Sequence, residues 1–233
     1  MSVQGVPSKF STEHQKKEFA ERLLKWWHTN KRDFPWRRTT DPYKILIAEL
    51  LLRKTTAKQV ATLYEKFLSK YPDLRALSEA PEKELEATIR PLGMEHKRAT
   101  LLKAIGSKIM QEYSGQVPTF KEDLMKLPGV GSYVANAILC FAHGKDVPLV
   151  DTNAIRVFQR VFGFQSQKRR PKDDRTLWDF VANTIPLGKA RDFNLAIIDH
   201  AHSICLPKYP RCRVCPLNTL CRYAQEGYGR FEG

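Results

Sequence analysis

Signals for helix starts and helix ends follow one another along nearly the whole sequence. Thr12 and Gln15 have the spacing of a capping box, in which two side chains satisfy free amides at a helix start. Thr56 and Gln59 repeat this spacing, and Pro72 ends the helix that they start. No two alternating apolar runs are joined by an Asn-Gly or Asp-Gly turn, the usual sign of a strand hairpin. The sequence therefore predicts an all-α fold.

Further start signals extend this pattern through the chain. Asp41 before Pro42 is typical of an N-cap followed by the first helical residue. Thr119 with Glu122 has the capping-box spacing again. The main helices are expected at residues 42–52, 56–71, 81–93, 95–113, 132–143, 152–162, 174–184 and 191–204.

These helices group most simply into two lobes. We expect a central helical lobe over residues 41–163, with a helical hairpin at about residues 120–143. The second lobe would combine residues 1–40 with residues 164–233, since the basic stretch after Phe164 is typical of an exposed connection.

The charge of the chain limits its partners. There are 39 Lys and Arg against 25 Asp and Glu, which gives a formal net charge of +14 at pH 7. Such a charge attracts a polyanion or an acidic membrane surface, and DNA or RNA is the leading partner. Basic residues that only solvate the surface are the alternative. No apolar run reaches the roughly 20 residues that span a bilayer, so we expect a soluble, intracellular protein without a membrane partner.

Four of the five cysteines lie close together near the C-terminal end. They form the pattern Cys205-x6-Cys212-x2-Cys215-x5-Cys221, whereas Cys140 stands alone in an apolar segment. An odd, clustered set in a reducing compartment indicates a metal site rather than disulfides. Four thiolates suit either zinc or an iron–sulfur cluster.

A short glycine-containing turn joins two apolar segments between Leu124 and Leu139. The turn contains Gly129, Val130 and Gly131. Glycines that adopt φ > 0 and carry no side chain let backbone amides and the next helix N-terminus meet a DNA phosphate. The pattern therefore predicts a helix-hairpin-helix DNA contact, although a turn between two core helices would have the same sequence.

A lone carboxylate, Asp151, precedes the predicted helix at 152–162. Asp is common as an N-cap, and this role alone would explain it. A carboxylate held at a helix N-terminus also stays ionised, which stabilises a cationic sugar when a glycosidic bond breaks. The two roles are compatible.

Together these motifs resemble one family. The hairpin LPGVG, the segment VDTNAIRV from Val150 and the four-cysteine pattern resemble the endonuclease III superfamily of helix-hairpin-helix DNA glycosylases, with a match from about Asp33 to Tyr223. The resemblance implies duplex DNA with a mismatched or damaged base as substrate. It also implies a [4Fe–4S] cluster held by Cys205, Cys212, Cys215 and Cys221.

Within this superfamily, the residue at position 133 distinguishes the chemistries. Endonuclease III-like members carry a nucleophilic Lys, adenine glycosylases usually carry Ser, and the branch acting on thymine or uracil opposite guanine carries Tyr, as Tyr133 does here. The segment PYKILIAELLLRKTTAKQV resembles the same branch. It makes Glu49, Arg53 and Lys54 candidate base-pocket and DNA-gap residues. Glu49 could instead be a polar residue on an exposed helix face.

Two further residues match family positions. Met94 resembles an apolar wedge that fills the space left by a flipped base, although a residue at a helix entry can also act as a hydrophobic staple. Asn153 resembles the partner of the catalytic carboxylate, although it could only support the first turn of its helix.

The resemblance implies a monofunctional DNA glycosylase of base-excision repair that releases thymine or uracil opposite guanine by hydrolysis. Asp151 would stabilise the sugar cation, and Glu49 and Tyr133 would hold the base. Alternatives are an adenine or purine mismatch glycosylase and a non-catalytic helix-hairpin-helix DNA-binding protein, which has no need of Asp151. We expect a monomer in the cytoplasm or nucleoid of a prokaryote.

Overall fold

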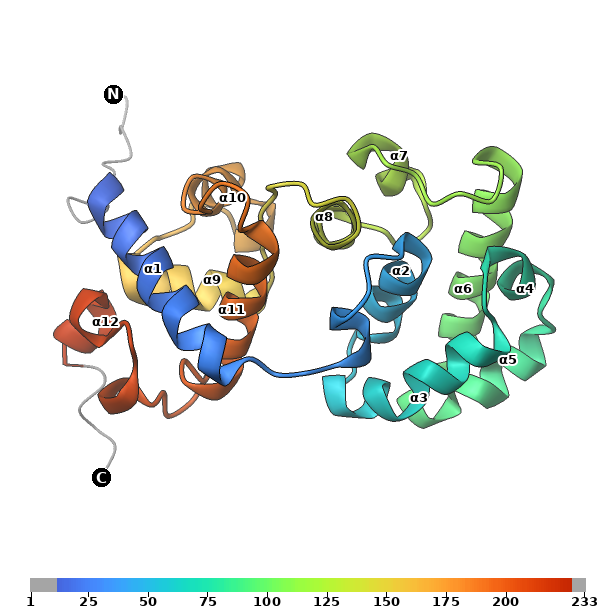
Figure 1. Cartoon of the computed structure of the whole chain (residues 1–233), viewed down its shortest axis with the longest axis horizontal. Helices are drawn as coiled ribbons and strands as arrows, with labels where there is room; N and C mark the ends of the chain where they lie inside the picture. The colour runs from blue at the N-terminus through green and yellow to red at the C-terminus, as the bar shows by residue number, and fades with distance from the viewer. Residues whose placement is uncertain (1–11, 228–233) are drawn as a thin grey trace. The chain divides into compact units, whose positions relative to one another are not determined.

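The structure is a computed structural model that describes residues 12–227 (Figure 1). Within these residues the chain forms helices and loops without strands, which confirms the predicted all-α class. None of the described helices combines the length and apolarity needed to cross a membrane. The described residues divide into two compact units: one is Asp33–Lys145, and the other joins residues 12–32 to residues 146–227.

This division differs from the predicted lobes of residues 41–163 and 1–40 with 164–233. Helix α9 (Thr152–Phe162), expected in the central lobe, belongs to the unit formed by residues 12–32 and 146–227. The reason is its strongly amphipathic sequence, which buries Val157, Phe158 and Val161 against α11 (Ala190–Ser203). Periodicity predicted the helix correctly but did not indicate which neighbour would cover its apolar face.

The Asp33–Lys145 unit is built around two packed groups of helices. Helices α4 and α5 pack against α6, and helix α8 packs against both α2 and α7 (Figure 1). Because nearly every residue of α2 is buried, the second helix of the hairpin rests on a core element. The elements are η1 (Pro35–Arg37), α2 (Pro42–Leu51), α3 (Ala57–Lys70), α4 (Leu74–Glu79), α5 (Glu82–Ile89), η2 (Arg90–Leu92), α6 (Glu95–Glu112), α7 (Lys121–Lys126) and α8 (Ser132–Phe141).

Most of the predicted helix starts in this unit are confirmed. Asp41 accepts hydrogen bonds from the first amides of α2, and Thr56 with Gln59 forms a complete capping box at α3. The start predicted at Thr119 is wrong, because α7 has Phe120 as its N-cap and no side-chain cap. Helix α4 was missed because it is only six residues long, too short to show an apolar period.

The other unit has an aromatic core. The ring of Phe19 lies edge-on to Phe158, Phe162 and Phe193, with centroid separations of 5.6, 5.0 and 6.1 Å. These contacts join α1 to α9 and α11. The capping box predicted at Thr12 starts α1. The elements are α1 (Glu13–Asn30), α9, η3 (Pro171–Asp173), α10 (Arg175–Ala182), α11, η4 (Cys212–Val214), η5 (Asn218–Leu220) and α12 (Arg222–Gln225).

A fully buried carboxylate, Asp199, fastens the end of α1 to α11. It accepts a hydrogen bond from Trp27 Nε1 at 2.9 Å and pairs with Arg32 Nε at 2.6 Å. Removing one partner of such a pair leaves an uncompensated group and costs about 3–5 kcal/mol. Asp199 therefore holds Arg32, the residue before Asp33, against α11.

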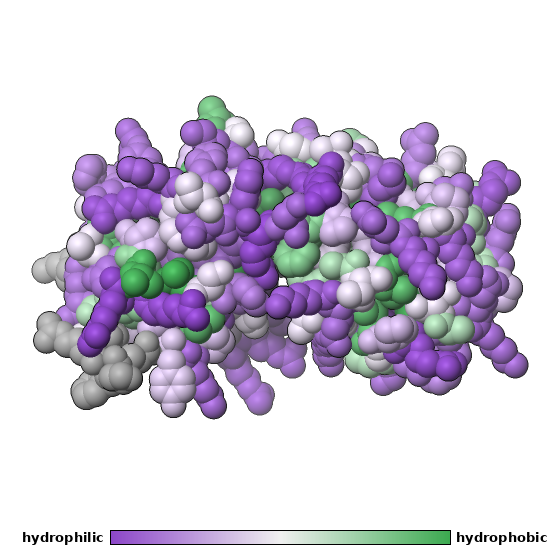
Figure 2. Space-filling model, turned by 60° about the horizontal axis from the view of Figure 1, so that its bottom comes forward, coloured by the Kyte–Doolittle hydropathy of each residue, from purple (hydrophilic) through white to green (hydrophobic). Residues whose placement is uncertain are grey.

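The face shown in Figure 2 carries mostly hydrophilic residues, with small separate hydrophobic areas. This surface suits a protein that binds a charged partner. Of the large hydrophobic residues that are exposed, Met94 is a predicted DNA wedge, and 48% of its surface is accessible.

Candidate functional site

Asp151 is held rigidly at the start of α9. Its Oδ1 accepts hydrogen bonds from the amides of Asn153 at 2.9 Å and Ala154 at 2.8 Å, and its Oδ2 accepts one from Asn153 Nδ2 at 2.7 Å. The N-cap role is confirmed. Since a carboxylate has about four acceptor positions, these three bonds leave capacity for a further donor, such as a water molecule.

A series of hydrogen bonds connects Asp151 to Cys205. Asn153 Oδ1 accepts a hydrogen bond from Arg156 Nη2 at 3.1 Å, and Arg156 Nε donates to the carbonyl of Cys205 at 2.8 Å. The orientation of the carboxylate is thus linked to residues 205–221, here called the cysteine loop. Sequence reasoning missed Arg156, although its spacing of three from Asn153 places both on one helix face.

The four clustered cysteines surround the end of the chain after α11. Cys205 follows α11, Cys212 is the first residue of η4 and Cys215 follows η4, and Cys221 precedes α12. All are free thiols, and no three Cys, His, Asp or Glu side chains in residues 12–227 are arranged to hold a single metal ion.

Burial makes the thiolate form of these cysteines unfavourable without a compensating charge. Burial, reinforced by the negative charges of the other three cysteines and opposed by a backbone hydrogen bond from Leu217, raises the pKa of Cys215 to about 12. Burial likewise raises the pKa of Cys221 to about 11. A positive centre would stabilise the thiolates of these buried cysteines.

Two nitrogen-bearing side chains reach these sulfur atoms. Arg160 Nη1 donates a hydrogen bond to Cys205 Sγ at 3.4 Å, and His200 Nε2 lies 3.2 Å from Cys215 Sγ. Burial, followed by the charge of Arg156, lowers the pKa of His200 to about 4, so that its ring is neutral near pH 7. His202, two residues further along, is exposed.

In the other unit, the hairpin turn requires glycine at one of its two glycine positions. Gly129 has φ +68°, and a Cβ there would lie only 2.7 Å from Arg53 Nη1. Gly131 has φ −100°, so of the two glycines in the turn only Gly129 uses the positive φ that both could adopt. Nothing lies within 4 Å of a Cβ built at Gly131, so the start of α8 has open space beside it.

Val130 contributes to the core of the hairpin. Its side chain is 6% exposed, and its amide donates to the carbonyl of Leu127 at 3.1 Å. The amides in the first turn of α8, which begins at Ser132, have no acceptor within their own helix. They are better placed than the Val130 amide to meet a phosphate.

The two candidate base-pocket residues lie on helices that pack together. Glu49 is on α2 and is only 7% exposed, so its assignment to an exposed helix face is wrong. Tyr133 is half-buried in the first turn of α8.

Lys54 and Met94 both adopt the left-handed conformation, with φ values of 53° and 55°. This conformation is unfavourable by about 1–2 kcal/mol for a residue with a Cβ. Such strain persists where the surroundings enforce it, and it is frequent at functional sites.

Buried Arg98, which sequence reasoning also missed, holds these two segments in place. Its guanidinium donates on one side to the carbonyl of Gly93 at 2.9 Å, next to Met94. On the other side it donates to acceptors around the end of α2, namely the carbonyls of Leu50, Leu51 and Arg53 and the hydroxyl of Thr55.

A cavity of about 330 Å³, here called the Met94 pocket, lies between these segments and the hairpin. It brings together four predicted DNA-contact residues: Arg53, Lys54, Met94 and Gly129. Arg53 Nη1 also donates to the carbonyl of Gly129 at 3.3 Å, which joins the end of α2 to the hairpin. The remaining lining residues are Leu50, Lys97, Arg98 and Leu101.

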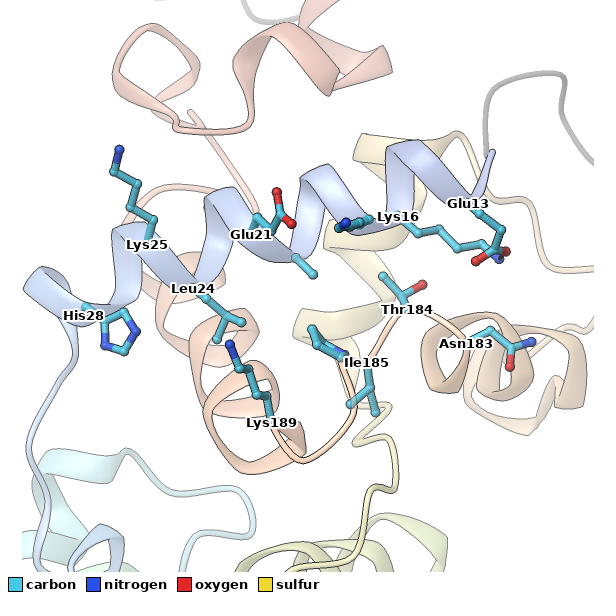
Figure 3. A pocket seen from close by; sticks show the side chains of 13 residues that line it. Glu13, Lys16, Glu21, Leu24, Lys25, His28, Asn183, Thr184, Ile185 and Lys189 are labelled. Carbon is cyan, nitrogen blue, oxygen red and sulfur yellow. Dashed lines mark hydrogen bonds and ion pairs between the residues drawn. The ribbon is translucent and has the colours of Figure 1, made fainter.

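A larger cavity, of about 510 Å³, lies along α1 and contains none of the predicted site residues. Figure 3 shows Leu24 of α1 beside Lys189, the residue before α11. Its lining carries both acidic and basic side chains, including Glu21 and Lys25. Size alone therefore does not locate the site.

Comparison with known families identifies this arrangement. Residues 47–183 match the HhH-GPD superfamily base excision DNA repair protein family, in a segment that includes the hairpin and Asp151. The chain belongs to the HhH-GPD superfamily.

Similar members of the superfamily carry related names. A thymine/uracil-DNA glycosylase of Pyrobaculum aerophilum is 45% identical over 90% of this chain and 93% of its own length. A solved thermostable thymine-DNA glycosylase superposes with a TM-score of 0.87 at 39% identity, covering 91% of this chain and 98% of that one. An endonuclease III trapped covalently on DNA gives 0.81 at 26% identity, covering 93% and 98%.

Proposed function

We propose that this HhH-GPD protein is a monofunctional DNA glycosylase that hydrolyses the N-glycosidic bond of thymine or uracil opposite guanine. The observation that carries the proposal is the fixed carboxylate of Asp151, combined with a phenol rather than an amine at position 133. The names of the Pyrobaculum aerophilum relative and of the solved thermostable thymine-DNA glycosylase support this substrate class.

Asp151 would act on the sugar. Loss of an unprotonated pyrimidine leaves an oxocarbenium-like deoxyribose and a base that departs as an anion. A preorganised negative charge stabilises this cation without reorganisation. The unused acceptor capacity of the carboxylate would orient the attacking water, while Asn153 keeps the carboxylate from rotating.

Glu49 and Tyr133 would hold the extruded base. A pyrimidine presents an N3–H donor and two carbonyl acceptors, which a buried carboxylate and a phenolic hydroxyl can bind in complementary ways. Because Tyr133 has no amine, a Schiff base cannot form at this position. The product is then an intact strand with an abasic site.

The Met94 pocket would meet the duplex where the base has left it. Enzymes that flip a base commonly insert apolar side chains into the stack, and exposed, conformationally fixed Met94 suits this role. Arg53 and Lys54 would contact the DNA around the gap. The start of α8 beside Gly131, with the backbone of Gly129, would bind a phosphate.

Cys205, Cys212, Cys215 and Cys221 would hold a [4Fe–4S] cluster. Four cysteine thiols in one short segment suit this group, and Arg160, which donates to Cys205 Sγ, would stabilise a negative sulfur there. The four cysteines would connect the end of α11 to the start of α12, and bound iron would supply the positive charge that their thiolates need.

We expect purified protein to be yellow-brown, with broad visible absorbance and about four irons per chain. Metal analysis together with the absorbance spectrum checks this expectation. Cys140, which is buried on α8 away from the cysteine loop in sequence, provides the control, because Cys140→Ala should keep the colour. A colourless, active preparation that contains zinc and no iron would contradict the cluster assignment.

The substrate proposal is tested by measuring base release from duplexes that differ at one pair. Thymine and uracil opposite guanine should be released in single-turnover assays, whereas adenine and hypoxanthine in equivalent mismatches should not. The protein would act in the cytoplasm or nucleoid of a prokaryotic cell, where uracil and T·G mismatches in the genome are accessible substrates. Preferential adenine release would favour a purine glycosylase, and tight binding without any release would favour a non-catalytic DNA-binding protein.

A further inference from the structure

His200 is a buried polar residue that the proposed glycosylase chemistry does not use. It lies on α11, five residues before Cys205, and is 1% exposed. The edge of the Trp26 ring packs against it at a centroid distance of 5.5 Å, with the two planes at 87°. Because α1 and α11 enclose the ring, its orientation is fixed by packing and no room remains for it to turn toward solvent.

The two ring nitrogens have different surroundings. Nε2 lies 3.2 Å from Cys215 Sγ, whereas Nδ1 is buried with no hydrogen-bond partner. A proton on Nδ1 would leave a buried donor unsatisfied and direct the Nε2 lone pair at a sulfur atom. A proton on Nε2 leaves only an unsatisfied acceptor and makes a hydrogen bond to sulfur, which is the less costly arrangement.

Metal binding removes the remaining ambiguity between the two tautomers. In the free thiol, Cys215 carries a proton that could itself be donated to Nε2. A metal-bound Cys215 is a thiolate and accepts only. The hydrogen bond then requires Nε2–H, and it is charge-assisted, which makes it about twice as strong as a neutral one.

We propose that His200 is a positioning residue whose Nε2–H donates to the Cys215 thiolate and thereby raises the reduction potential of the cluster and slows its loss. The inference rests on the proposed [4Fe–4S] assignment. A hydrogen bond to a ligating sulfur stabilises the more negative, reduced state of a cluster. It also lowers the basicity of the sulfur, so that protonation and release of iron become slower.

The test compares three variants of the full chain in the iron-loaded form. His200→Met fills the space of the ring with an apolar side chain and removes the N–H donor. His200→Gln retains an N–H donor. His202→Leu is the control, because it changes an exposed histidine on the same helix. The measurements are the midpoint potential of the cluster and the rate at which its visible absorbance is lost to an iron chelator. Far-ultraviolet circular dichroism reports whether each variant is folded.

We expect His200→Met to have a more negative midpoint potential and to lose iron about tenfold faster than the wild type. The expected shift in midpoint potential corresponds to a tenfold change in the oxidised-to-reduced ratio, which is about 59 mV for a one-electron couple. His200→Gln should fall between the two, and His202→Leu should match the wild type. Potentials and loss rates that are equal in all four proteins would overturn the proposal.

Two further outcomes are decisive. If His200→Met does not fold, the protonation site of His200 in the wild type tests the proposal instead. 15N nuclear magnetic resonance of the histidine-labelled protein should place the proton on Nε2. A proton on Nδ1 would reject the hydrogen bond. A zinc-containing, colourless wild type would reject both the cluster assignment and this inference, whereas a normal iron cluster with unchanged potentials would reject only the role of His200.

Discussion

Asp151→Asn should lower the single-turnover rate of thymine or uracil release by about 10³-fold or more while leaving the affinity for mismatched duplex close to that of the wild type. The substitution preserves the size of the side chain but removes its negative charge, and the charge is what stabilises the sugar cation. Asn is also a good N-cap, so α9 should form normally.

A second N-cap provides the matched control for this variant. Asp73 accepts the Ala76 amide at 2.8 Å at the start of α4, so Asp73→Asn removes the same charge from an equivalent position outside the site. It should release base at the wild-type rate. Near-wild-type turnover by folded Asp151→Asn would exclude Asp151 from the chemistry.

Tyr133→Lys should convert the protein into an enzyme that sodium borohydride traps covalently on mismatch-bearing DNA, whereas the wild type is not trapped. The new amine would lie in the first turn of α8, half-buried at a helix N-terminus. Burial and the positive end of the helix dipole both lower the pKa of a lysine and release the free amine, which attacks the anomeric carbon.

Denaturing gels detect both the trapped complex and strand cleavage at the abasic site. Tyr133→Gln provides the control, because it removes the phenol without supplying an amine and should show neither product. A folded Tyr133→Lys protein that is never trapped would indicate that position 133 does not face the sugar. Trapping of the wild type would mean that another amine serves as nucleophile and that the enzyme is not monofunctional.

Local sequence signals predicted the helices well because they depend on neighbouring residues. The capping boxes at Thr12 and Thr56 and the N-caps at Asp41 and Asp151 all depend on side chains that satisfy amides two or three positions away. The assignment of α9 to a lobe depended instead on partners far along the chain. Sequence periodicity contains no information about which distant helix covers an apolar face.

The same distinction separates the site residues that were found from those that were missed. Residues in a recognisable motif, such as Cys205 or Gly129, could be identified from spacing and resemblance. Arg98 could not, because all the acceptors of its guanidinium except the carbonyl of Gly93 lie more than 40 positions away in sequence. The contact between His200 and Cys215 depends on the path of the loop after α11, which spacing does not determine.

The discontinuous unit imposes an order on folding during synthesis. Asp33–Lys145 is continuous and has its own core, so it can fold once it has left the ribosome. Helix α1 precedes it but finds its partners only after α9 and α11 have been made. At roughly 5–20 residues per second, the 172 positions between Trp27 and Asp199 take about 10–30 s to translate. During that interval the apolar face of α1 has no native cover, and the cysteine loop acquires all its thiols only when Cys221 has been added.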